Sequence, residues 1–91
     1  MAAYLQVKYT QNVDGWAYEI MSDSHHISHS AGAVSSLIEA RALARSELPS
    51  LGYDAVDLTN QDLRLNEWTD TVMDFILVIP RNEEARRWLP R

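Results

Sequence analysis

Apolar and polar residues alternate on both sides of an Asp14-Gly15 pair near the start of the chain. Because successive strand side chains point to opposite faces, the pattern predicts two β-strands within residues 4–21, joined by a tight turn at Asp14-Gly15. This turn would pair Val13 with Trp16, and burial of one face should select that register. The large apolar side chains then share one face: Leu5, Val7, Tyr9, Val13, Trp16, Tyr18 and Ile20.

A helix is expected in the middle of the chain, beginning near Ser35 or Ser36. Ser36 and Glu39 have the spacing of a capping box, in which each side chain accepts a hydrogen bond from the other residue's backbone N–H. Pro49, followed by Gly52, should end the helix. The stripe expected to pack on the hairpin is Leu37, Ala40, Leu43, Ala44 and Leu48, with Arg41 and Arg45 on the helix surface.

The remaining segments complete an α+β prediction. Residues 25–30 are compatible with a short third strand, and residues 53–58 with a strand or an ordered loop. Residues 71–79 are apolar enough for a strand covered on both faces for much of its length, and residues 82–89 favour a short terminal helix. The predicted fold is a small antiparallel sheet packed against one main helix, with a short C-terminal helix, in a single domain of residues 1–91.

Composition narrows the class of protein. The chain has 91 residues, 46% of them hydrophobic, which fits one folded domain with a modest core. It has no cysteine, so it has no disulfide framework and no thiolate zinc site. We find no secretory leader pattern and no apolar run near the ~20 residues that span a bilayer, and we therefore expect a cytoplasmic protein with no membrane contact.

Charge and motifs bear on partners and catalysis. Thirteen acidic residues against eight basic ones give a net charge of −5, which argues against nucleic-acid binding and is compatible with a basic protein partner. We find no nucleophile elbow, phosphate-binding glycine loop or dinucleotide fingerprint. We therefore expect no enzyme activity and no cofactor.

Three histidines lie close together at His25, His26 and His29. On a helix the first and third would share a face at the separation of metal-binding pairs. On a strand they would stand about 13 Å apart, too far for one ion. The context favours a strand or loop, so we expect no metal and interpret the histidines as solvated or partner-contacting. A small enzyme that uses these histidines with an acid stays an alternative.

Asp74 is unusual because it interrupts the apolar run of residues 71–79. A charge in such a strand needs a partner or an exposed position. We interpret Asp74 as an edge-strand charge that discourages aggregation, in preference to a catalytic acid.

Five residues are candidates for contact with a protein partner. Acidic side chains would steer a basic partner, and tryptophans would anchor it. Trp88 either closes the core or forms an apolar patch for another chain. The candidates are Asp54, Asp57, Asp62, Trp68 and Trp88.

The order of predicted elements resembles the HicB-like antitoxin domain. The resemblance covers residues 4–48 and rests on residues 4–7, 14–18, 27–30 and 38–43. It implies a protein that covers a small basic toxin nuclease and forms homo-oligomers through its sheet or helix. The alternative from a different class is a structural homodimer or phage-type accessory protein that pairs by its sheet edges.

Overall fold

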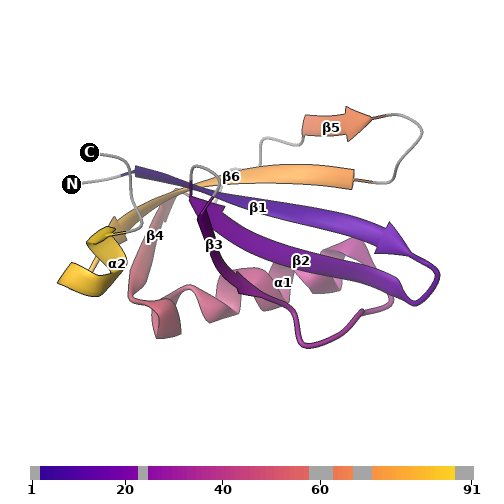
Figure 1. Ribbon diagram of the computed structural model, residues 1–91, viewed down its shortest axis with the longest axis horizontal. Helices are drawn as coiled ribbons and strands as arrows, with labels where there is room; N and C mark the ends of the chain where they lie inside the picture. Colours follow the sequence, from indigo (N-terminus) through magenta and orange to yellow (C-terminus); the bar gives the residue numbers. More distant parts are fainter. Residues whose placement is uncertain (1–2, 23–24, 58–62, 67–70, 88–91) are drawn as a thin grey trace.

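A computed structural model describes residues 3–22, 25–57, 63–66 and 71–87 (Figure 1). Its helical segments are α1 (Leu37–Glu47), the 3-10 turn η1 (Pro49–Leu51) and α2 (Glu83–Arg87). The strands are β1 (Ala3–Asn12), β2 (Gly15–Ser22), β3 (His25–His29), β4 (Tyr53–Asp57), β5 (Leu63–Asn66) and β6 (Thr71–Pro80). The strand predicted within residues 25–30 is therefore confirmed as β3, and the one at residues 71–79 as β6.

The described strands form one antiparallel sheet in the order β3-β2-β1-β6-β4, and β5 also pairs with β6. The sheet curls into a half-barrel, and α1 runs along one side of it (Figure 1). The predicted fold class, a small sheet packed against one main helix, is wrong because the molecule is mostly sheet. The difference arises from β4, which was left open between a strand and an ordered loop, and from β5, where no strand was predicted.

The first hairpin has the predicted faces along its paired residues but a different register, and Val13, predicted on the apolar face, lies in the turn and is fully exposed. Gln11, not Val13, pairs with Trp16, and the turn residues are Val13 and Asp14. A shift of two residues leaves every side chain on its original face, so burial of one face does not distinguish the two registers. The Asn12 side chain favours the observed turn, because its Oδ1 accepts a hydrogen bond from the Asp14 N–H at 3.0 Å.

Gly15 is needed for close approach of two backbones rather than for the turn itself. Its φ is +123°, and a Cβ placed on it would lie 2.3 Å from the Val34 carbonyl oxygen. Next to it, Trp16 and Val34 exchange two backbone hydrogen bonds of 2.7 and 2.8 Å. The glycine thus lets the segment before α1 lie against the start of β2.

The helix starts as predicted, but its buried stripe differs. Ser36 is the N-cap, and its Oγ accepts a hydrogen bond from the Glu39 N–H at 3.1 Å. Leu43, expected in the stripe, is 45% exposed. Arg41 and Arg45, expected on the helix surface, are half-buried instead.

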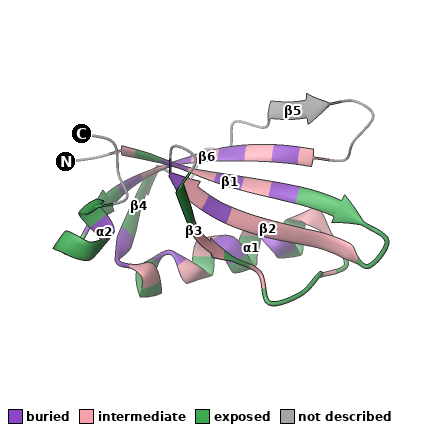
Figure 2. Ribbon diagram, viewed as in Figure 1, coloured by how far each residue is buried: buried purple, intermediate pink, exposed green. Residues whose placement is uncertain are grey.

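One hydrophobic core joins the inner face of the sheet to the helical segments. Apolar side chains from β1, β2 and β6 meet alanines of α1 and Ala85 of α2, and the inner positions along the strands are buried (Figure 2). The fully or nearly fully buried members are Leu5, Val7, Tyr9, Ile20, Ala40, Ala44, Leu48, Tyr53, Val72, Ile76, Val78 and Ala85.

Candidate partner-binding face

Strand β6 is apolar on both of its faces. Its inner side chains, including Ile76 and Val78, are buried in the core, and the outer ones alternate with them (Figure 2). The outer positions Met73, Phe75 and Leu77 are half-buried, and Ile79 is 40% exposed. The strand was predicted to be covered on both faces for much of its length, whereas its outer side is covered only in part.

Strand β1 extends this apolar surface. Tyr4 lies opposite Leu77 in the antiparallel pairing and is 56% exposed. Directly opposed residues point to the same face, so the two side chains lie together on the outer side of the sheet. We call the surface made by Tyr4, Met73, Phe75, Leu77 and Ile79 the outer apolar face.

The rim of the outer apolar face carries one of the predicted partner-binding acids. Asp54 lies opposite Ile79 in the pairing of β4 with β6, and its side chain is 57% exposed. Its Oδ1 forms an ion pair with Arg81 Nε at 3.4 Å. Beside it Val56, at a bulge in β4, is 54% exposed. The structure therefore places an acid and a further apolar residue next to the outer apolar face.

The other predicted contact residues stay predictions. Asp57 belongs to β4 and lies opposite Leu77 along the backbone. Asp62, Trp68 and Trp88 lie outside the described residues. The sequence did not predict the outer apolar face, although its signal was the apolar run of residues 75–79, which was expected to be covered on both faces.

Asp74 lies in the interior of the sheet and not at an edge. It is fully buried, and β6 is flanked by β1 on one side and by β4 and β5 on the other. Arg41 donates two hydrogen bonds to its carboxylate, each 2.9 Å long. The edge-strand interpretation of Asp74 is therefore wrong, and the buried charge is neutralised by a bidentate partner from α1.

Two more polar side chains surround this ion pair. The Arg41 guanidinium lies 5.7 Å from the centre of the Tyr9 ring, in cation–π range. The Tyr9 hydroxyl and the Nε and Nη2 of Arg45 are buried, with no hydrogen-bond partner among the described residues. Burial, and then the charge of Asp74, raise the pKa of Tyr9 far above its ordinary value, so this phenol stays neutral.

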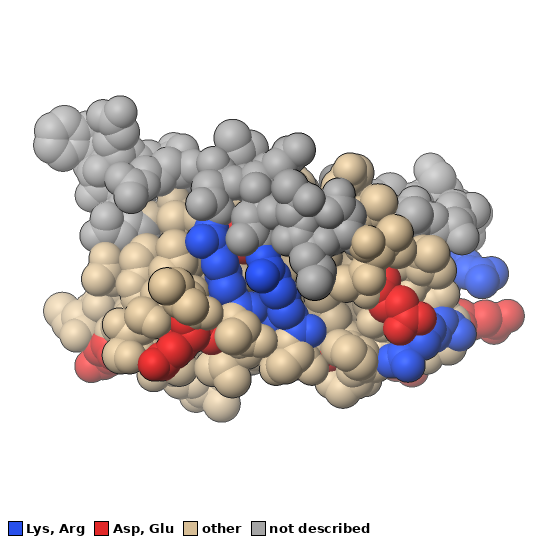
Figure 3. Space-filling model, turned by 180° about the vertical axis from the view of Figure 1, so that it is seen from behind, with Lys and Arg blue, Asp and Glu red and all other residues tan. Residues whose placement is uncertain are grey.

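Basic side chains stand together at the centre of the back of the molecule, with acidic ones to both sides (Figure 3). Arg41 and Arg45 are one helical turn apart on α1, and the carboxylate of Asp74 satisfies the first of them. The buried carboxylate of Asp74 neutralises the charge of Arg41, so this ion pair can hold α1 against the sheet. This arrangement supports a structural role for the Arg41–Asp74 ion pair.

A second carboxylate joins α1 to the other end of the sheet. Glu47 accepts a hydrogen bond from the Tyr18 hydroxyl at 2.5 Å and another from the Ser28 hydroxyl. Burial, followed by the hydrogen bond to Glu47 and its charge, raises the pKa of Tyr18 to about 12. Glu47 therefore ties α1 to both β2 and β3.

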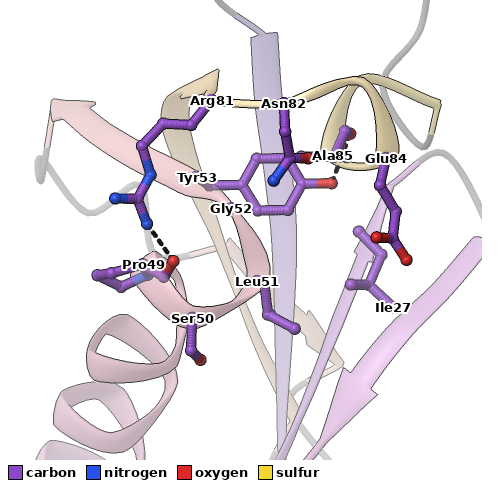
Figure 4. Close-up of a pocket in the computed structure, with 10 residues that line it drawn as sticks. All are labelled: Ile27, Pro49, Ser50, Leu51, Gly52, Tyr53, Arg81, Asn82, Glu84 and Ala85. Carbon is purple, nitrogen blue, oxygen red and sulfur yellow. Dashed lines mark hydrogen bonds between the residues drawn. The ribbon is translucent and has the colours of Figure 1, made fainter.

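An open pocket of about 560 Å³ lies between η1 and α2 (Figure 4). Many of the polar groups in its wall already have partners. The Tyr53 hydroxyl donates to the Ala85 carbonyl at 2.8 Å, Asn82 Oδ1 accepts from the Ala85 N–H at 2.8 Å, and Arg81 donates to the Pro49 carbonyl. The bond from Tyr53 holds α2 against the start of β4, the Asn82 bond caps α2, and the Arg81 bond ties the end of β6 to η1, which together favour a structural role for the pocket wall.

Comparison with protein-family models, with curated proteins and with solved structures finds no match for this chain. Among the described residues, no helix is long and apolar enough to cross a membrane.

Proposed function

We propose that the protein is a noncatalytic interaction module that binds a small basic protein through its outer apolar face. The observation that carries this proposal is the outer side of β6, where Leu77 and Ile79 face outward beside Tyr4 instead of entering the core. Burying a large apolar side chain that was exposed contributes about 1.5–3 kcal/mol. A partner that covers this face would therefore gain affinity from several side chains at once.

Charge favours a basic partner over a second copy of the chain. The protein has a net charge of −5, so two copies repel each other, whereas a basic partner is attracted. Asp54 on the rim supplies one negative charge beside the apolar centre. An apolar centre with a polar rim is the usual anatomy of a protein interface.

The resemblance of residues 4–48 to the HicB-like antitoxin domain suggests the class of this partner. Under this hypothesis the protein acts in the cytoplasm as an antitoxin-type inhibitor, which binds a small basic nuclease and blocks it sterically. The outer apolar face would cover part of the partner's surface, and the acidic side chains would raise the rate of association.

The experiment is affinity purification of the tagged protein at low salt, with mass spectrometry and light scattering of the recovered complex. We expect one small basic protein at fixed stoichiometry. The variant Tyr4→Lys/Ile79→Lys should lose this protein, because it places two positive charges on the outer apolar face. The matched control is Ile38→Lys, which changes an apolar residue of α1 that is 79% exposed.

Two results would contradict the proposal. Recovery of the same partner by the Tyr4→Lys/Ile79→Lys variant would show that binding uses another surface. A homodimer without a basic protein, dissociated by the same variant, would favour the structural homodimer.

A further inference from the structure

A bulge in β3 brings two histidines to the same side of the sheet. Glu19 pairs with His29 and Met21 with His26, so the three β3 residues from His26 to Ser28 face only two residues of β2, and Ile27 is the extra residue. In a regular strand, residues three apart point to opposite faces. The extra residue reverses this relation, so His26 and His29 both lie on the outer side with Glu19.

The side chains form a continuous chain of short contacts. Glu19 Oε2 lies 2.7 Å from Nδ1 of His26, and Nε2 of His26 lies 3.2 Å from Nδ1 of His29. The two rings have centroids 5.2 Å apart. The other carboxylate oxygen of Glu19 lies 3.9 Å from Lys8 Nζ. The His26 side chain is 47% exposed, so a solute can reach it.

We propose that His26 and His29 bind one divalent transition-metal ion, with Zn²⁺ as the type ion, through Nε2 of His26 and Nδ1 of His29. With metal–nitrogen bonds of about 2.0–2.1 Å, nitrogens 3.2 Å apart subtend an angle of about 100° at the ion, close to the tetrahedral value. Imidazole ligands favour Zn²⁺, Ni²⁺ and Cu²⁺ over Mg²⁺ and Ca²⁺, which prefer oxygen.

Glu19 supports this assignment as a positioning residue. A metal-binding histidine commonly donates its other ring N–H to a carboxylate, which fixes the tautomer and the ring orientation. The Glu19 carboxylate accepts such a hydrogen bond from Nδ1 of His26, which leaves Nε2 of His26 directed at His29. Within the described part of the chain no group of three or more His, Cys, Asp or Glu side chains could hold a metal, so the proposed site has two protein ligands and leaves the other coordination positions open to solvent.

The test is calorimetric titration of the metal-free full chain with ZnCl₂, and with MgCl₂ as the hard-cation comparison. We expect one Zn²⁺ per chain, no heat from Mg²⁺, and a zinc-dependent shift of the NMR signals of His26 Nε2 and His29 Nδ1. His26→Ala and His29→Ala should each weaken zinc binding at least about tenfold, and Glu19→Gln by about 10–100-fold. Circular dichroism checks that each variant is folded.

His25→Ala is the matched control, because it removes an imidazole from the same strand at the position opposite Ser22, and it should keep the wild-type affinity. The proposal is overturned if zinc does not bind, or if it binds equally well to the His26→Ala and His29→Ala variants. One ion per two chains would also overturn it, because that stoichiometry indicates a bridge between copies.

Discussion

Arg41 on α1 binds both carboxylate oxygens of Asp74 on β6, with two N–H···O distances of 2.9 Å. Asp74 is fully buried, and the Arg41 side chain is only 15% exposed. A buried ion pair contributes little net stability compared with an apolar pair, but each member depends strongly on the other. The contact therefore fixes the position of α1 on the sheet and has a clear signature in mutagenesis.

Asp74→Ala should destabilise the fold by about 3–5 kcal/mol, because it leaves the Arg41 guanidinium buried without its carboxylate. Urea denaturation measures the change in the free energy of unfolding. The double variant Arg41→Met/Asp74→Leu removes both charges and should cost clearly less than Asp74→Ala alone. Equal losses in the single and double variants would show that the ion pair is not the source of the effect.

The free energy of unfolding should fall at alkaline pH because Tyr18 loses its proton there. The unfolded chain loses this proton near the ordinary pKa of 10.0, whereas burial, the hydrogen bond to Glu47 and its charge raise the folded-state pKa to about 12. Between these two pKa values the folded state holds more protons than the unfolded state. The contribution of Tyr18 to the free energy of unfolding is therefore complete below pH 10 and is lost as the pH rises. Urea denaturation should show a shallower decline for Tyr18→Phe. Parallel curves for the two proteins would contradict this assignment.

Gly15→Ala should destabilise the hairpin. The new Cβ would lie 2.3 Å from the Val34 carbonyl oxygen, at a φ of +123° that other residues rarely adopt. Backbone strain of this kind costs on the order of 1–3 kcal/mol. Gly32→Ala is the matched control, because a Cβ there meets nothing within 4 Å. Thermal unfolding should show a lower midpoint for Gly15→Ala alone, and equal midpoints would exclude the close approach at Val34.

Local patterns predicted several parts of the fold. Alternation gave the correct inner face for Leu5, Val7 and Tyr9, and the capping box located the start of α1. The hairpin register was missed because a shift of two residues preserves every face. Residues 53–58 were left open between a strand and an ordered loop, and no strand was predicted at β5, because both segments are short and pair with β6 at a bulge, which interrupts simple alternation.

The site was harder to predict because it depends on contacts between distant residues. Arg41 was assigned to the helix surface by its polarity, although Asp74 in the apolar run needed a partner 33 residues away. His26 and His29 are on one face only because of the bulge at Ile27, which a single sequence does not reveal. The outer side of β6 was expected to be covered because its residues are as apolar as those of the inner side.

Binding of a basic protein by the outer apolar face is the function proposed for this chain. Its most direct test is methyl NMR of the labelled protein, titrated with the basic partner recovered by affinity purification. We predict shifts and line broadening for the methyl groups of Met73, Leu77 and Ile79, while those of Ile38 on α1 stay unchanged. Changes at Ile38 and Leu43 with none along β6 would rule out the outer apolar face as the binding surface, because they would place the interface on the helix.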